Sequence, residues 1–248
     1  MSRYFLEVSY KGTNYSGFQS QHNANTIQAE IEKAFKVIQK EKIIMTGSSR
    51  TDAGVHALQN FFHFDFEGHL NSDLAYKMNA ILPEDIVGKQ IIPVAEDAHC
   101  RFDALSREYK YYIYRHKNPF LKDIAFYYPY KLDIEILHQA AAIIKEYEDF
   151  TSFSKRNTQV KSFTCEIHES EWNLENDCLV YHVKAKRFLR GMVRALTATM
   201  LKVGQGKLSL NQFRDIIEAK DCTKASFAVP SQGLFLVSVA YSSILPGE

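Results

Sequence analysis

The segment Gly47–Ala57 contains three side chains that can take part in chemistry: Arg50, Asp52 and His56. Arg50 and Asp52 are only two positions apart, and a neighbouring cation keeps a carboxyl group ionised. An ionised carboxylate can act as a nucleophile or as a base. A connection between two paired strands commonly needs only about two to five residues. This longer polar connection is therefore either a functional loop or a solvated hairpin loop.

A second concentration of charge lies between Lys184 and Arg194, where five basic residues occur without an acid. The apolar spacing predicts a helix over 188–203. At about 100° per residue, Arg190 and Arg194 of that helix and Arg187, the residue just before it, fall on one stripe. No acid stands four positions away to pair with these charges. Three arginines on one stripe favour a phosphate-binding wall over an ordinary solvated face.

The segment REYKYYIYRH at 107–116 has the alternation of a strand. One face of it carries Arg107, Tyr109, Tyr111, Ile113 and Arg115. Aromatic rings beside cations on a sheet are typical of surfaces that stack on nucleic-acid bases. The alternative is a buried role, which we expect for most of these tyrosines, with one or two left to line a cleft.

The elements around the Asp52 loop are predicted to follow the order β-α-β-β-α-β of a ferredoxin-like unit. Alternation over 4–10 predicts the first strand, and Asn25 is the predicted cap of a helix that runs through residue 38. The other expected elements are strands at 42–46, 58–68 and 86–94 and a helix at 72–81.

The second half of the chain has a similar pattern without sequence identity to the first. The expected elements are strands at 107–116, 163–174, 179–185 and 234–241, and helices at 133–144, 188–203 and 211–219. No linker rich in Pro or Ser separates the halves. The chain is therefore predicted to be an α+β protein with two halves, 1–104 and 105–248, whose sheets join around a central cleft.

Charge is balanced over the 248 residues, with 30 Lys and Arg against 29 Asp and Glu. This balance excludes disorder driven by charge and gives no global sign of nucleic-acid binding. The distribution is uneven, because residues 1–104 hold 10 bases and 13 acids while residues 105–248 hold 20 and 16. The basic segments of the second half are compatible with a modest, salt-sensitive affinity for nucleic acid.

Several other classes of site lack their usual motifs. The four cysteines include no C-x-x-C pair and the nine histidines no H-E-x-x-H motif, so we expect no metal site and reduced thiols in a cytoplasmic protein. The N-terminal residues do not resemble a signal peptide, and no stretch approaches the ~20 apolar residues of a membrane span. A poised carboxylate pair and a G-x-S-x-G nucleophile are also missing.

Five blocks of the sequence, in order, resemble the tRNA pseudouridine synthase A family. They are YKGTNYSGFQ at 10–19, SRTDAGVHA at 49–57, SREYKY at 106–111, RFLRGMVR at 187–194 and PSQGLFLVSVAY at 230–241. The RTDAGVH string is highly specific, and the blocks span almost the whole chain. The resemblance implies two ferredoxin-like halves that form a continuous, mainly antiparallel sheet with a central RNA-binding cleft.

The resemblance also implies an activity. It implies an isomerase that converts uridine to pseudouridine at positions 38–40 of the tRNA anticodon stem-loop. It implies a homodimer that binds tRNA and uses neither a cofactor nor a metal. Which tRNAs and which of the three positions are modified stays open.

Individual residues match the motifs of the family. Asp52 matches the catalytic aspartate, and Arg50 matches the arginine that flanks it. Tyr109 matches the tyrosine that stacks on the target base, and Arg194 the arginine that pairs with the catalytic carboxylate. The residues then freer to meet tRNA phosphates are Arg187 and Arg190. Three mechanisms stay open for Asp52. It could attack C1′ of the ribose, assist the loss of the 2′ proton, or attack C6 of the base.

The sequence departs from the family pattern at Ser49, where glycine is usual, and at Gln59-Asn60, where Gly-Gln is usual. These departures lie beside the matched catalytic positions and not at them. They raise the alternative of a related enzyme with a different RNA target. Further alternatives are a non-catalytic RNA-binding module and a carboxylate-dependent hydrolase that does not act on RNA.

Overall fold

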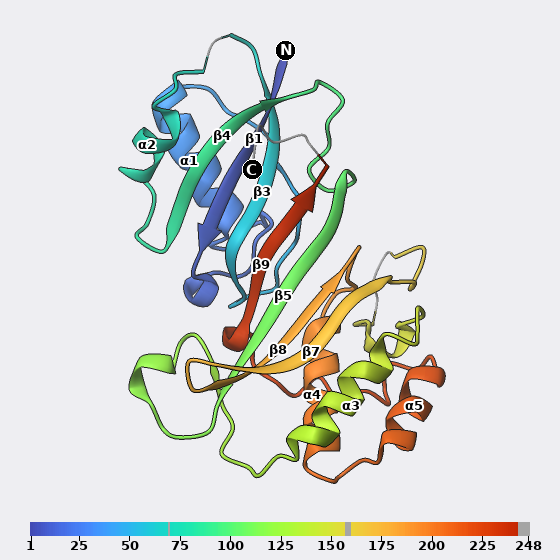
Figure 1. Ribbon diagram of the computed structural model, residues 1–248. Helices are drawn as coiled ribbons and strands as arrows, with labels where there is room; N and C mark the ends of the chain where they lie inside the picture. The colour runs from blue at the N-terminus through green and yellow to red at the C-terminus, as the bar shows by residue number, and fades with distance from the viewer. Residues whose placement is uncertain (69, 157–159, 243–248) are drawn as a thin grey trace. The chain divides into compact units, whose positions relative to one another are not determined.

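The computed structural model describes residues 1–68, 70–156 and 160–242 (Figure 1). The chain has a mixed α+β structure that divides into two compact units. The first unit holds Met1–Ser106 and the segment that begins at Phe235, and the second holds Arg107–Leu234. The predicted halves, 1–104 and 105–248, instead put the last strand of the chain with the second half.

The first unit contains a sheet with the strand order β4-β1-β3-β9, in which β2 also pairs with β3. Its strands are β1 (Ser2–Tyr10), β2 (Thr46–Gly47), β3 (His56–Phe66), β4 (Ile86–Val94) and β9 (Leu234–Tyr241). The pairings of β1 with β3 and β4, and of β2 with β3, are antiparallel, whereas β9 pairs in parallel with β3. With its helices α1 (Ile27–Gln39) and α2 (Leu74–Asn79), the unit has the predicted β-α-β-β-α-β order before β9 is added.

Helix α1 covers one face of this sheet, and Figure 1 shows α2 on the same side. The hydroxyl of Thr26 caps α1 by accepting a hydrogen bond from the backbone N–H of Ala29 at 3.3 Å. The predicted cap, Asn25, is therefore wrong by one residue. The buried ring of Phe35 packs edge-on against Phe64 of β3, with 5.4 Å between ring centroids. This packing fixes α1 on the face of the sheet that Phe64 covers.

The second unit contains a sheet with the strand order β5-β8-β7, in which β6 also pairs with β5. Its strands are β5 (Ala104–Tyr114), β6 (Phe126–Tyr127), β7 (Ile167–Glu175) and β8 (Cys178–Ala185). Its α-helices are α3 (Ile134–Ile144), α4 (Met192–Gly204) and α5 (Leu210–Glu218). Short 3₁₀ helices of the chain lie at Gly12–Asn14, Pro119–Leu121, Thr151–Phe153 and Ser231–Gly233. The β5–β8 and β7–β8 pairings are antiparallel.

Helix α4 begins later than predicted, at Met192. Gly191 precedes it with a φ of 76°, a left-handed conformation through which a right-handed helix does not continue. Arg187 and Arg190 therefore lie outside the helix, and only Arg194 belongs to it. The prediction of an arginine-rich helix with all three side chains on one stripe is wrong, because the 3.6-residue periodicity does not extend back through Gly191.

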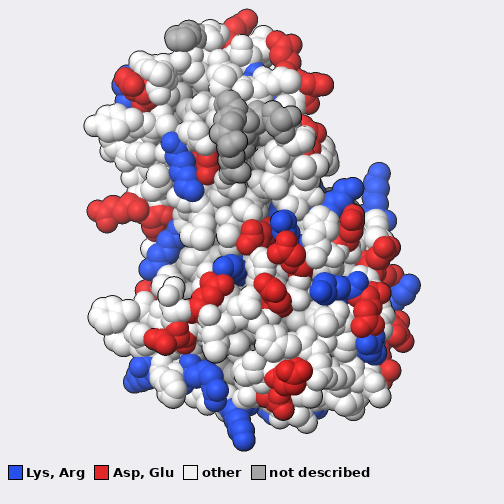
Figure 2. Space-filling model, in the orientation of Figure 1, with Lys and Arg blue, Asp and Glu red and all other residues white. Residues whose placement is uncertain are grey.

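The surface of the molecule is mixed in charge on the face that Figure 2 presents, where Lys and Arg are interspersed with Asp and Glu. Charged side chains of the described residues also pair across strands, as Lys110 of β5 does with Glu175 of β7 at 2.8 Å. A mixed surface of this kind is typical of solvent-exposed protein and does not form one large basic field. Within the residues that the structure describes, no helix combines the length and the apolar character needed to cross a membrane.

Candidate active site

The loop that carries Asp52 connects β2 to β3 and is held by bonds on both sides of the carboxylate. The backbone N–H of Phe18 donates to the carbonyl oxygen of Thr51 at 3.1 Å, and the Tyr10 and Thr51 hydroxyls are 2.8 Å apart. The carbonyl oxygen of Asp52 accepts a hydrogen bond from the N–H of Val55 at 3.2 Å. The half-buried Asp52 side chain is thus presented from a fixed backbone, which is what a catalytic group requires.

Gly12 allows the N-terminal segment to approach this loop closely. A Cβ atom on Gly12 would lie 2.0 Å from the carbonyl oxygen of Val55, so no larger residue fits without a backbone shift. The N–H of Gly12 also donates to Nδ1 of His56 at 3.1 Å. The His56 ring is buried against Phe235, with 4.5 Å between ring centroids. His56 therefore supports the loop from a buried position.

Asn60 supports the loop from strand β3. Its side-chain nitrogen donates to the carbonyl oxygen of Ser49 at 2.9 Å and to the hydroxyl oxygen of Tyr10 at 3.2 Å. Its side-chain oxygen accepts the N–H of Phe61 at 2.9 Å. Asn60 is fully buried. Two positions at which the sequence departs from the family pattern, 49 and 60, are therefore in direct contact, and the contact involves the backbone of Ser49.

The two charged residues of the loop, Arg50 and Asp52, have different surroundings. Arg50 is exposed and lines a cavity of about 270 Å³. The other residues that line this cavity are Phe18, Gln19, Gln28, Met45, Thr46, Gly47, His99, Arg101 and Phe102. Asp52 is not among them. Arg50 is thus available to a group bound in that cavity.

Arg194 lies in the first turn of α4 in the second unit and is half-buried. Its Nε and Nη2 atoms both donate to the carbonyl oxygen of Val229, at 3.0 and 2.6 Å. The hydroxyl of Tyr111 donates to the next carbonyl, that of Pro230, at 2.6 Å. Burial raises the pKa of Tyr111, so this hydroxyl stays a donor. The guanidinium is therefore oriented through two bonds to one neutral carbonyl oxygen.

Tyr109 lies two residues before Tyr111 on β5, and the two side chains have different environments. Tyr111 is completely buried, whereas Tyr109 is half-buried. The Tyr109 ring packs edge-on against Phe188, with 5.1 Å between ring centroids. Of the four tyrosines in 107–116, Tyr111 and Tyr114 are buried, whereas Tyr109 and Tyr112 are half-buried, so half of them and not most belong to the core. Tyr109 is thus partly accessible.

Arg187 and Arg190 precede α4 and gain a further basic neighbour. Arg187 is half-buried and Arg190 is exposed. The N–H of Lys155 donates to the carbonyl oxygen of Arg190 at 3.0 Å. The side chain of Lys155 also crosses Gly191, where an added Cβ would lie 3.1 Å from its Cγ atom. The fold thus brings Lys155, from a separate basic segment, beside the arginines that the sequence singles out.

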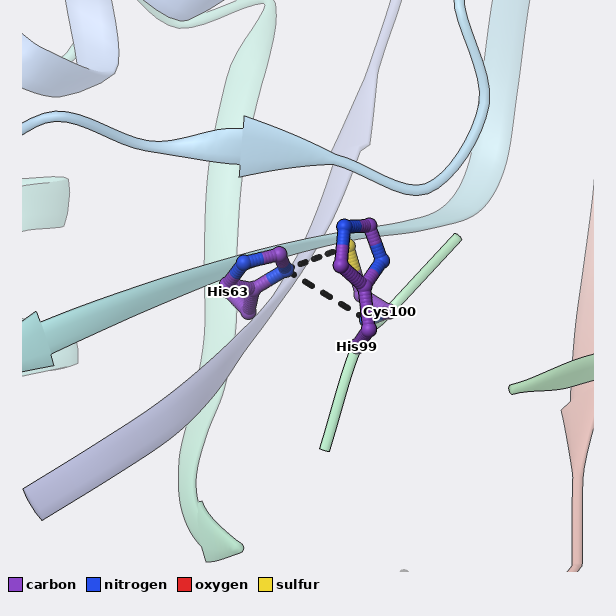
Figure 3. A group of neighbouring side chains, drawn as sticks. All are labelled: His63, His99 and Cys100. Atoms are coloured by element: carbon purple, nitrogen blue, oxygen red, sulfur yellow. Dashed lines mark hydrogen bonds between the residues drawn. The ribbon is translucent and has the colours of Figure 1, made fainter. Parts of the chain in front are cut away.

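The fold also gathers three metal-ligand types that are separated in the sequence: His63, His99 and Cys100 (Figure 3). Their ligand atoms lie within 4.8 Å of one another. The hydrogen bonds, however, occupy the lone pairs that a metal ion would need. Nδ1 of His99 accepts the N–H of Arg101 at 3.1 Å, and Nδ1 of His63 accepts the N–H of Cys100 at 3.4 Å. A neutral ring that accepts at Nδ1 carries its proton at Nε2.

The sulfur of Cys100 fits the same interpretation, because it donates to the carbonyl oxygen of Thr46 at 3.1 Å and so carries a proton. Burial lowers the pKa of His63 to about 4 and also lowers that of His99, which keeps both rings neutral near pH 7. The cluster is therefore better described as a neutral hydrogen-bonded support than as a metal centre.

Comparison with known proteins assigns the chain to a family. A family model described as tRNA pseudouridine synthase matches residues 7–103 and 146–242. The chain is 45% identical to a tRNA pseudouridine synthase A of Parabacteroides distasonis, over 97% of this chain and 96% of that protein. It is 42% identical to that of Porphyromonas gingivalis, over 99% of both chains, and 35% identical to that of Staphylococcus aureus, over 96% and 90%.

The chain belongs to the tRNA pseudouridine synthase A family. This confirms the family resemblance seen in the five sequence blocks. The family model covers Asp52 and its loop in its first matched segment and Arg187–Arg194 in its second. Among solved structures, a Cas6-RT-Cas1–Cas2 complex is found at 9% identity, over 100% of this chain and 47% of that one, but its TM-score of 0.22 is too low to inform the fold.

Several residues shape this site through contacts that the sequence alone does not predict. The supporting roles of Asn60, His56 and Tyr10 depend on contacts between separate elements, so no local sequence pattern predicts them. The YKGTNYSGFQ block did contain a usable signal, because two glycines within a polar segment indicate a close backbone approach. Phe188 was predicted as part of a helix, and its contact with Tyr109 was not foreseen.

Proposed function

We propose that this chain isomerises uridine to pseudouridine in tRNA, with Asp52 as the nucleophile. The observation that carries the proposal is the intact RTDAGVH loop, held at Thr51 and Ser49 by bonds from Phe18, Tyr10 and Asn60. Its nearly full-length similarity to tRNA pseudouridine synthases A supports the same activity. A pseudouridine synthase is an isomerase, since the product has the same atoms as the substrate.

The reaction must break the N1–C1′ bond, turn the uracil and join C5 to C1′. In the proposed route the ionised carboxylate of Asp52 attacks C1′, and the N1–C1′ electron pair leaves with the uracil. After the uracil has turned, C5 attacks C1′ and the carboxylate leaves. The C5 proton is lost to solvent, and N1 gains one. The same carboxylate could instead remove the 2′ proton or attack C6. Deuterium at C2′ distinguishes these routes, because it slows only the one that removes the 2′ proton.

Arg194 and Tyr109 have distinct roles in this proposal. Arg194 supplies the positive charge that keeps the catalytic carboxylate ionised once water is excluded. Tyr109 stacks on the target uracil and keeps the detached base from diffusing away, which is supported by its partly accessible ring and the packing of Phe188 against it. The target nucleotide has to leave its stack to reach them, as it does in other enzymes that act on bases.

The substrate is proposed to be the anticodon stem-loop of tRNA at positions 38–40. Arg187 and Arg190 contact its phosphates, and Lys155 adds charge beside them. Arg50, which flanks Asp52 in the loop, is proposed to belong to the catalytic group with Asp52 and Arg194, as the family resemblance implies. The family resemblance implies three further parts of the proposal: a homodimer, a cytoplasmic location and a reaction without a cofactor. It also implies two ferredoxin-like halves, 1–104 and 105–248, that share a continuous sheet and form a central cleft.

The test uses unmodified tRNA transcripts that carry tritium at C5 of uridine. The purified protein is expected to release tritium, because C5 loses its proton when it bonds to C1′. Mapping of pseudouridine in the products is expected to place it at positions 38–40. Modification elsewhere would indicate a related enzyme with a different target, and tRNA binding without tritium release would indicate a non-catalytic module. Both results would overturn the proposal.

A further inference from the structure

The cavity beside Arg50 has the composition of an anion site. Among the described residues that line it, the charged side chains are those of Arg50 and Arg101, both exposed, and none is an acid. Burial lowers the pKa of His99, which therefore adds a neutral polar edge. The volume of about 270 Å³ is slightly below the range of drug-sized pockets, so the cavity fits one phosphate with part of a nucleotide.

A stacking platform stands at the edge of this cavity. Phe102 lines the cavity and is 74% exposed, so its ring is accessible to a bound base. The guanidinium of Arg101 lies over this ring, 5.7 Å from its centroid. An exposed aromatic ring with an adjoining arginine is the combination that proteins use to stack on unpaired bases while neutralising the backbone.

The platform is rigid because its base is tied to the core of the first unit. Nδ1 of His99 accepts the N–H of Arg101 at 3.1 Å, and the N–H of His99 donates to Asp103 at 2.6 Å. The Cys100 sulfur is bound to Thr46 of β2, and the Cys100 carbonyl accepts the Tyr241 hydroxyl at 2.6 Å. The cluster in Figure 3 thus holds the turn that precedes Phe102, whose N–H donates to the carbonyl oxygen of His99 at 3.1 Å. A backbone that is already ordered loses little entropy when the turn binds a ligand.

We propose that Phe102, Arg101 and Arg50 form a second nucleotide subsite, which binds the phosphate and base of a tRNA nucleotide next to the target uridine. The place follows from the loop itself, because Arg50 contacts this cavity and stands two residues before Asp52. The inference rests on the proposed function, since it takes Asp52 as the position of the target. The subsite binds the strand and takes no part in bond making.

The experiment compares Phe102→Leu with a matched control, Tyr76→Leu, in the full-length protein. Tyr76 is 79% exposed on α2 of the same unit and does not line the cavity. We expect Phe102→Leu to raise both KM and Kd for tRNA by about 5- to 100-fold, which is the effect of one base stack. Its kcat at saturating tRNA is expected to stay within about twofold of wild type. Tyr76→Leu is expected to leave all three constants unchanged.

Arg101→Gln tests the phosphate contact separately. It is expected to reduce the slope of log Kd against log salt by about one phosphate equivalent. Wild-type KM, Kd and salt slope in both folded variants would overturn the subsite. A changed oligomeric state with unchanged tRNA affinity would also overturn it and identify Phe102 as part of a protein interface.

Failure of the proposed function can be distinguished from failure of the subsite, because the wild-type protein itself would then release no tritium. The Kd measurements do not depend on turnover, so they report on the subsite in either case. Circular dichroism of each variant checks that the fold is intact.

Discussion

The side-chain amide of Asn60 donates a hydrogen bond to the carbonyl oxygen of Ser49, at 2.9 Å. The same nitrogen bonds the hydroxyl of Tyr10, which in turn lies 2.8 Å from the hydroxyl of Thr51. One buried amide thereby connects strand β3 to the backbone immediately before Arg50 and Asp52. Since the bond is made to a backbone carbonyl, the serine at position 49 can replace a glycine without changing this support.

Replacement of Asn60 by Ala is expected to lower kcat and to destabilise the fold. The change leaves the Ser49 carbonyl and the Tyr10 hydroxyl without their buried donor, which costs about 1–3 kcal/mol of unfolding free energy. Urea unfolding and tritium release measure the two effects. Tyr10→Phe removes only the hydroxyl and is expected to have a smaller effect on both. Wild-type stability and kcat in Asn60→Ala would show that the amide does not hold the loop.

Gly12→Ala is expected to reduce activity by displacing the loop. Its Cβ would lie 2.0 Å from the Val55 carbonyl oxygen, so the backbone must shift, at a cost of about 1–3 kcal/mol. Gly88→Ala is the matched control, because its nearest neighbours are 3.6 Å away, an ordinary contact. Thermal unfolding and kcat are measured for both variants. If the two behave alike, the close approach at Gly12 is not what positions Asp52.

These cases show how much of the site the sequence could predict. The helix cap at Asp133 and the start of β8 after Asp177 follow from local signals, since a capping side chain and a turn act within a few residues. The prediction of one arginine stripe was wrong because Gly191 has a left-handed backbone conformation. The helix begins only after it, at a point where the sequence pattern looks continuous.

Contacts between segments that are distant in the sequence also could not be predicted. The pairing of β9 with β3 and the cluster of His63 with His99 join residues far apart in the chain. No spacing rule predicts such contacts, because they depend on how whole elements pack. Asp52 stands out in the sequence by its place beside Arg50 in a long polar loop, and Tyr109 by its face of a predicted strand, but their individual roles are implied only by the family resemblance.

Replacement of Arg187 and Arg190 by Ala is expected to weaken tRNA binding and to reduce its salt dependence. Each phosphate contact that is lost lowers the slope of log Kd against log salt by about one, so the double variant should lose about one to two. The Lys122→Ala, Lys131→Ala double variant removes two exposed charges elsewhere in the second unit and serves as the control. An unchanged slope for the arginine variant would mean that these side chains only contact solvent.

The stability of the fold is expected to fall as the pH is lowered from about 6.5 towards 4. Burial lowers the pKa of His63 to about 4, whereas an unfolded histidine titrates near 6.5. The unfolded chain therefore binds more protons in this window, and the folded state loses about 2 kcal/mol by pH 5. Urea unfolding at several pH values measures the slope. His63→Gln should flatten it, and an equally steep slope in that variant would assign the effect to other groups.

The most direct test of the central claim is the Asp52→Asn variant on unmodified tRNA labelled at C5 of uridine. The amide has nearly the same shape as the carboxylate but no nucleophilic charge, so tRNA binding and fold are expected to persist. Tritium release is expected to fall by about 10³-fold or more, while the exposed control Asp97→Asn keeps wild-type activity. Pseudouridine formation by Asp52→Asn at a rate within about tenfold of wild type would contradict the assignment of Asp52 as the nucleophile.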